Sequence, residues 1–176
     1  MLVDSEAEVQ ALALEGIEAV TSGGVDIDPG LLYGLPDEDG ALRTRPVMRL
    51  VARVLSTKPL KAGDAVSYGY THRAASDTTA ALVAGGYAQG IVRALGNAAH
   101  VEVRGTMRPI IGRVAMDVCV VDVGSTDGAA TGDEVTYFGG SGPASPNLAR
   151  WRSVTGLSAG ELIAVAGAHA GRRWEA

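Results

Sequence analysis

The feature that most constrains the fold is a series of short, valine-rich segments separated by turn signals between residues 47 and 140. Apolar and polar residues alternate in "HVEVRG" at 100–105, while "TTAALVAGG" at 78–86 and "DEVTYFGG" at 133–140 are short apolar stretches that end in glycine. Short strands with turn signals about every 10–15 residues are typical of a β-sandwich or β-barrel. The pattern therefore predicts a mainly β domain.

The longest of these segments, "RPIIGRVAMDVCVVDVG" at residues 108–124, predicts an extended strand with a β-bulge at Gly112. On such a strand Arg113 and Asp117 share one face, an arrangement typical of a structural ion pair. Met116 lies on the opposite face with the valines, where a methionine is most simply a core residue.

Helices are expected on both sides of the β region. Residues 4–20 predict a helix because Ser5 and Glu8 have the spacing of a capping box. Residues 26–45 are rich in proline, glycine and acids and predict a loop with at most a short strand or turn. Two further helices are predicted at 145–154 and 158–170. The expected fold is thus a closed, Greek-key-like β-barrel with a short N-terminal helix-and-loop segment and a short helical tail.

Charge and composition exclude several classes of function. The net charge of −5 argues against nucleic-acid binding, which needs clustered basic residues. Cys119 is the only cysteine and the three histidines lack ligand spacing, so neither an intrachain disulfide nor a metal site is expected. No apolar run approaches the ~18 residues of a membrane span, and the acidic N-terminus is unlike a signal peptide. We therefore expect a cytoplasmic protein with no membrane partner.

Two aromatic stretches are candidates for chemistry. "AVSYGYTHRA" at 65–74 contains Tyr68, which taken alone is most simply a half-buried aromatic with its hydroxyl in water. "GGYAQG" at 85–90 is most simply a glycine-rich turn, since it lacks the residues of a phosphate-binding loop.

The order of these motifs carries more information than any one of them. "VSYGYT", "GGYAQG", "VRGTMRPIIGRVAMD" and "GDEVTYFG", preceded by "RPVMRLVARV", resemble the C-terminal domain of alanine racemases. The resemblance implies an N-terminal TIM-type barrel followed by a β domain, with residues 1–45 as the end of that barrel and residues 46–176 as the β domain. It also implies the interconversion of L- and D-alanine with pyridoxal 5'-phosphate (PLP), for peptidoglycan synthesis, in a homodimer.

The resemblance implies a role for individual residues. Racemisation needs one proton-transfer group on each face of the α-carbon, and Tyr68 matches the tyrosine base opposite the PLP-bearing lysine. A tyrosine, with an ordinary pKa of about 10, needs nearby positive charge to act as a base. Met116 matches the methionine whose backbone N–H contacts the substrate carboxylate. Residues of the substrate access corridor match Tyr87, Arg93, Arg113 and Asp117, and the loop that holds the PLP phosphate matches Gly30 and Leu31.

The sequence also departs from the family pattern where the family binds PLP. Asp28 replaces an arginine, Gly160 stands in place of a tyrosine that reaches the phosphate, and Gln89 replaces the aspartate of "GYADG". The only lysines, Lys58 and Lys61, do not lie in the context of the PLP lysine.

Three interpretations therefore remain open. The chain is a fragment of a racemase, one half of a split enzyme that offers Tyr68 to a separate barrel subunit, or a degenerate, non-catalytic β module for binding or assembly. In each case we expect the chain alone not to racemise alanine.

Overall fold

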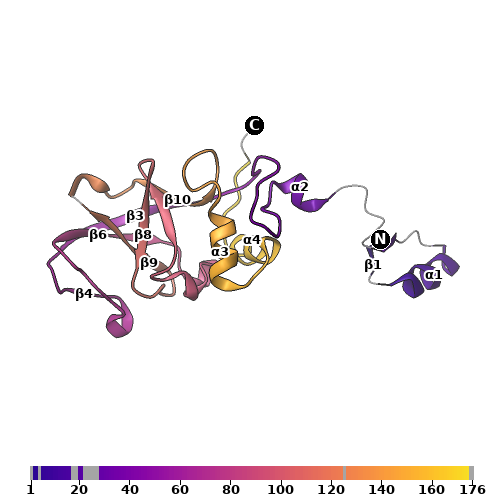
Figure 1. The fold of residues 1–176 in the computed structure, drawn as a ribbon, viewed down its shortest axis with the longest axis horizontal. Helices are drawn as coiled ribbons and strands as arrows, with labels where there is room; N and C mark the ends of the chain where they lie inside the picture. The colour runs from indigo at the N-terminus through magenta and orange to yellow at the C-terminus, as the bar shows by residue number, and fades with distance from the viewer. Residues whose placement is uncertain (1, 4, 17–19, 22–27, 125, 175–176) are drawn as a thin grey trace.

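A computed structural model defines residues 2–3, 5–16, 20–21, 28–124 and 126–174, and its main feature is a closed β-barrel (Figure 1). Six strands in the described part of the chain follow the order β10–β3–β6–β9–β8–β7, and β7 pairs with β10 to close the barrel. All neighbouring strands are antiparallel. The prediction of a closed, mainly β fold is confirmed. The strands are β3 (Arg49–Leu60), β6 (Thr78–Ala84), β7 (His100–Val103), β8 (Thr106–Ile111), β9 (Val118–Gly124) and β10 (Glu134–Gly139).

The barrel interior follows from the alternation along each strand. In β9, Cys119, Val121 and Val123 are buried and the residues between them are partly exposed. Successive side chains of a strand point to opposite faces of a sheet, so one face of β9 lines the core. Valines of β3, β6, β7 and β10 complete it: Val54, Val83, Val101, Val103 and Val135.

The segment at 108–124 differs from the prediction of one bulged strand. It forms two strands, β8 and β9, which pair with each other, and residues 112–117 are a loop between them. The chain leaves the sheet at Gly112, whose φ of 72° is unfavourable for a residue with a Cβ. Val114 lies in this loop but is buried, which explains why the apolar pattern continued across it.

The helical tail matches its prediction, with α3 at Asn147–Thr155 and α4 at Ala159–Gly167. Ser158 and Glu161 form a capping box at the start of α4. The N-terminal helix α1 (Glu6–Leu14) is shorter than predicted, although Ser5 caps it by accepting a hydrogen bond from the Glu8 N–H at 3.3 Å. The end of the predicted range, residues 17–19, lies outside the described residues.

The segment predicted as a loop contains one short helix, α2 (Pro29–Tyr33), which the sequence pattern did not predict. Proline at the first helical position and an aspartate cap are helix-start signals that make this turn possible. The remaining short elements are β1 (Leu2–Val3) and β2 (Val20–Thr21), which pair in parallel, and β4 (Ala65–Val66) and β5 (His72–Arg73), which pair antiparallel.

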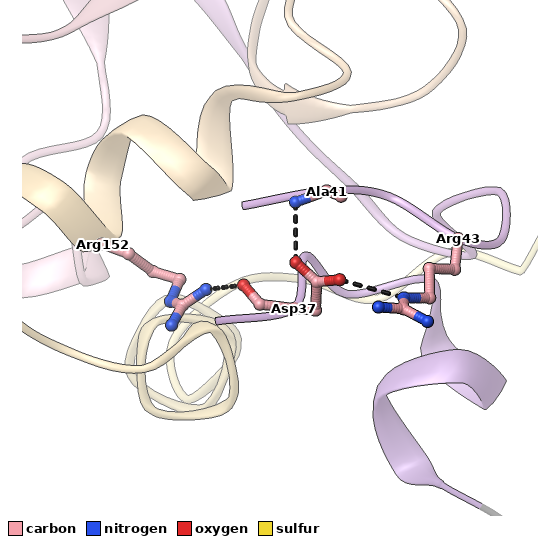
Figure 2. Close-up of polar contacts among 4 residues, drawn as sticks. All are labelled: Asp37, Ala41, Arg43 and Arg152. Atoms are coloured by element: carbon pink, nitrogen blue, oxygen red, sulfur yellow. Dashed lines mark hydrogen bonds and ion pairs between the residues drawn. The ribbon is translucent and has the colours of Figure 1, made fainter. Parts of the chain in front are cut away.

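The segment that follows α2 is tied to the helical tail through Asp37 (Figure 2). Its carboxylate accepts hydrogen bonds from Arg43 Nε at 3.0 Å and from the Ala41 N–H at 2.8 Å, and its carbonyl accepts one from Arg152 of α3. The Arg43 and Ala41 contacts lower the pKa of Asp37 below its ordinary value. Residues 37–43 are therefore part of the same folded body as the barrel's helical end.

No helix within the described residues is long and apolar enough to cross a membrane.

Trp151 anchors α3 to the barrel. It is fully buried and meets the rings of Phe138 and Tyr137 of β10 edge-to-face, with centroid distances of 5.3 Å and 6.2 Å. Large buried aromatic side chains are major contributors to core stability.

We expect Trp151→Ala to lower the free energy of unfolding by about 3–5 kcal/mol, because it leaves a large cavity between α3 and β10. Trp174, which is 90% exposed, supplies the control, and Trp174→Ala should change stability by less than about 0.5 kcal/mol. Urea denaturation followed by circular dichroism measures both. Equal losses in the two variants would show that the α3 contact does not stabilise the barrel.

Candidate active site

The loop that carries Tyr68 connects β4 to β5 and includes a 3₁₀ turn at Tyr68–Tyr70. Ser67 precedes the turn with a φ of 63°, an unusual conformation for a residue other than glycine, and its hydroxyl donates a hydrogen bond to the Arg113 carbonyl at 2.7 Å. Such backbone conformations persist where surrounding contacts hold them. The Ser67 contact therefore positions Tyr68 against the 112–117 loop, with 73% of the tyrosine exposed.

Asn97 joins the same two loops from a third segment. Its side-chain oxygen accepts a hydrogen bond from the Gly112 N–H at 2.6 Å, and its side-chain nitrogen donates one to the Thr71 hydroxyl at 3.2 Å. A Cβ on Gly112 would lie only 2.6 Å from the Cβ of Ser67. The Tyr68 loop and the 112–117 loop thus pack backbone against backbone, and only glycine allows that approach.

A second turn, which follows β6, meets the other end of the 112–117 loop. The Tyr87 N–H donates to the Ala115 carbonyl and the Ala88 N–H to the Met116 carbonyl, each at 2.9 Å. A Cβ on Gly86 would stand 2.3 Å from the Ala115 oxygen and 2.4 Å from the Met116 oxygen. The two hydrogen bonds therefore require glycine at position 86.

These loops border an open pocket of about 610 Å³. Five of the residues selected from the sequence line it, and they come from four separate segments of the chain: Tyr68, Tyr87, Arg93, Arg113 and Met116. The volume lies within the range of small-molecule sites, and the lining combines aromatic rings, apolar groups and positive charge.

One arginine of the pocket stacks on a tyrosine ring, and the other lies beside the turn that carries Tyr68. The Arg93 guanidinium lies 4.0 Å from the centroid of the Tyr87 ring, a cation–π contact. The Arg113 guanidinium carbon lies 3.4 Å from the position of a Cβ on Gly69, directly after Tyr68. Within the described residues neither guanidinium has a carboxylate at ion-pair distance. The site is therefore positively charged.

The structure corrects two predictions made for the 112–117 loop. Met116 is 55% exposed and faces the pocket, so it is not a core residue. Its N–H donates to no acceptor in the described chain and is available to a ligand. Asp117 does not pair with Arg113; its carboxylate instead accepts a hydrogen bond from the Gln89 side chain at 3.0 Å, and Asp117 is not part of the pocket lining.

The residues that match the cofactor loop are placed apart from the pocket lining. Gly30 and Leu31 belong to α2, and the Gly30 N–H donates to the Asp28 carboxylate at 2.7 Å. Lys61 is exposed and forms an ion pair with Asp77 at 2.7 Å, and that contact raises its pKa above the ordinary value.

The sequence did not indicate which residues hold the loops together, although Gln89 was noted as a departure from the family pattern. These residues are Ser67, Gly86, Asn97 and Gln89. The signal for Gly86 was present in the glycine pair at 85–86, which indicated only a turn. Contacts between side chains and distant backbone groups leave no periodic pattern in a sequence.

Gly86→Ala should lower the free energy of unfolding by about 2 kcal/mol or more, since the added methyl overlaps two carbonyl oxygens and the neighbouring backbone must shift. Gly160→Ala is the matched control: nothing lies within 4 Å of its Cβ position in α4, and alanine there should stabilise the protein by up to about 1 kcal/mol. Thermal denaturation of both variants checks the pair. A neutral Gly86→Ala would mean that the crossing of the two loops is not tight.

The sequence of this chain is similar to that of one family of known proteins. The sequence model described as "Alanine racemase, C-terminal domain" matches residues 47–174. An alanine racemase of Mycolicibacterium vanbaalenii is 41% identical over 130 residues, which are 71% of this chain and 33% of the relative. One from Mycobacterium avium is 38% identical over 141 residues, which are 78% of this chain and 36% of the relative. The chain spans about a third of the length of these relatives.

Solved structures give the same result. The alanine racemase of Streptomyces lavendulae matches with a TM-score of 0.67 and 35% identity, over 86% of this chain and 39% of that one. The alanine racemase of Bacillus anthracis with bound L-Ala-P matches with a TM-score of 0.72 and 26% identity, over 90% of this chain and 46% of that one. The similarity thus extends over the barrel and the loops that form the pocket.

Proposed function

Because this chain belongs to the family of the alanine racemase C-terminal domain, we propose that it supplies Tyr68 as a proton-transfer group for the interconversion of L- and D-alanine. The observation that carries the proposal is the convergence of the Tyr68 side chain and the Met116 loop on one positively charged pocket. The rest of the site, including the cofactor, would come from a lysine-bearing α/β barrel. That barrel either precedes the β domain in the same polypeptide or belongs to a separate subunit.

Each residue of the pocket has a task in this proposal. The Tyr68 oxygen would remove or return a proton on one face of the substrate α-carbon. A group from the α/β barrel would do the same on the other face. Arg113, placed beside Gly69, would stabilise negative charge that develops on the Tyr68 oxygen during transfer. The Met116 N–H, which has no acceptor among the described residues, would bind the substrate carboxylate.

The exposed position of Tyr68 and Met116 supports completion of the site by another domain or subunit. Tyr68 is 73% exposed and Met116 is 55% exposed. General acid–base catalysis works best in a site that excludes water and fixes the reacting groups. A homodimer, in which the Tyr68 loop enters the partner's site, would provide such a cover.

The cofactor of the family, PLP, supplies an electron sink that makes the α-proton of an amino acid removable. The residues of this chain that match its binding loop do not fit its phosphate. Asp28 already accepts the Gly30 N–H, and its carboxylate places negative charge where a phosphate would need donors. The ion pair with Asp77 raises the pKa of Lys61, which disfavours the unprotonated amine that a Schiff base needs. We therefore assign PLP binding to the lysine-bearing α/β barrel and not to the residues of this chain.

The misfit at Asp28 is also the observation that favours the alternative function, a non-catalytic module that keeps the racemase β domain for binding or assembly. The two functions differ in whether Tyr68 matters to any reaction.

A chimera tests that difference. Residues 47–174 replace the matching domain of the Streptomyces lavendulae alanine racemase, and racemisation of L-alanine is followed by loss of optical rotation. We expect Tyr68→Phe to lower kcat by about 100-fold or more, because general acid–base catalysis contributes that much. Tyr70→Phe, in the same turn and 68% exposed, should leave kcat within about twofold. Equal activity of the two variants would remove Tyr68 from the chemistry and favour the non-catalytic module.

The cofactor assignment has its own test. The full chain, incubated with PLP and reduced with borohydride, should give no stoichiometric adduct at Lys58 or Lys61 by peptide mass spectrometry. The chimera, which contains the barrel of the relative, is the positive control. A stable absorbance band of a Schiff base that Lys61→Arg removes from the full chain would contradict the assignment.

A further inference from the structure

We propose that Gln89 is a positioning residue that sets the charge of the pocket by holding the Asp117 carboxylate out of it. The inference rests on the proposed function, because it concerns the same pocket and deepens its selectivity for a small carboxylate. Gln89 lies in the 3₁₀ turn Tyr87–Gln89, between the barrel strand β6 and the arginine of the pocket at position 93.

The side chain of Gln89 makes two hydrogen bonds of opposite sense. Its oxygen accepts from the Gly86 N–H at 2.9 Å, and its nitrogen donates to the Asp117 Oδ1 at 3.0 Å. A backbone N–H can only donate and a carboxylate can only accept, so the orientation of the amide is fixed. Gln89 thus spans from its own turn to the 112–117 loop, and we call this pair of hydrogen bonds the Gln89 latch.

The latch decides where a negative charge lies. Asp117 is exposed and directly follows Met116, whose N–H faces the ligand in the proposed site. With the carboxylate bound to Gln89, Asp117 is not among the residues that line the pocket, whereas Arg93 and Arg113 are. The lining therefore carries two guanidinium groups and no carboxylate, which favours an anionic ligand.

An acid at position 89 would act in the opposite direction. A carboxylate there can still accept the Gly86 N–H, but it has no hydrogen to donate to Asp117. Two carboxylates at 3.0 Å, the present distance between Gln89 and Asp117, would repel each other. Asp117 would then turn away from position 89, and we expect it to move toward the guanidinium groups of the pocket, because its neighbour Met116 lines that pocket.

The 15N-labelled full chain is titrated with propionate, a small carboxylate, and with propionamide, its neutral counterpart, and amide shifts of residues 85–93 and 112–117 are followed by NMR. Gln89→Glu should weaken propionate binding about fivefold, the effect of one like charge at roughly 4 Å in water. Propionamide binding should not change between variants. Failure of propionate to bind the unmodified chain, or equal affinity in Gln89→Glu, would overturn the proposal.

Two variants separate the latch from simple charge or folding effects. Gln89→Glu combined with Asp117→Asn keeps the net charge of the original pair and reverses the latch. The new amide at position 117 can donate a hydrogen bond to the new carboxylate at position 89. This double variant should restore the original affinity for propionate. Asp117→Asn alone keeps a hydrogen bond to Gln89 and should leave affinity within about twofold, because the charge that it removes already lies outside the pocket. Tighter binding in that variant, or no rescue in the double variant, would contradict the latch.

The binding measurements test the latch independently of the proposed catalytic role of Tyr68. Propionate binding by this chain does not depend on proton transfer by Tyr68, so a fully active Tyr68→Phe chimera would end the catalytic proposal and leave the latch intact. A failed rescue would end the latch and leave the role of Tyr68 untouched.

Discussion

The site depends on the two hydrogen bonds by which the Tyr87 and Ala88 N–H groups bind the carbonyls of Ala115 and Met116. They join the turn after β6 to the loop between β8 and β9, and they form only because Gly86 has no Cβ. Without this crossing, Tyr87 and Met116 would sit on independent loops. With it, both belong to the rim of a barrel whose inward-facing side chains form a buried core.

The rest of the pocket is added to that crossing by side-chain contacts. Ser67 binds the Arg113 carbonyl, and Asn97 binds Gly112 and Thr71, so the Tyr68 loop is held against the far end of the 112–117 loop. The 112–117 loop is thus the common support of every segment that lines the pocket. Positioned groups are what acid–base chemistry and carboxylate binding require, since a rigid site does not have to reorganise during the reaction.

Much of the fold could be predicted from the sequence, because alternation and turn signals report directly on which side of a strand is buried. The β8–β9 boundary could not, since Val114 remains buried in a loop and continues the apolar pattern. The short helix α2 was missed because five residues with two helix-start signals are outweighed by the surrounding prolines and glycines. Its capping aspartate, Asp28, was noted only as a departure from the family.

The grouping of Tyr68, Tyr87, Arg93, Arg113 and Met116 was expected from the resemblance to alanine racemases, and composition or spacing alone did not indicate it. The hydrophobicity of Met116 predicted a core residue, but the side chain is exposed. In our proposal its backbone N–H binds the ligand, and the identity of a side chain does not indicate whether the backbone N–H of that residue has an acceptor. The contact between Gln89 and Asp117 could not be predicted either, because the two residues are 28 positions apart in sequence and no local pattern connects them.

The central claim, that Tyr68 serves one face of the α-carbon, is tested most directly by solvent deuterium exchange in the chimera that carries residues 47–174. With the original Tyr68, deuterium from D₂O should enter the α-position during conversion of either enantiomer. With Tyr68→Phe, only one enantiomer should exchange its α-proton for deuterium, and it should keep its configuration. The reason is that only the proton-transfer group of the α/β barrel remains. Exchange of both enantiomers at equal rates, with inversion, would contradict the account.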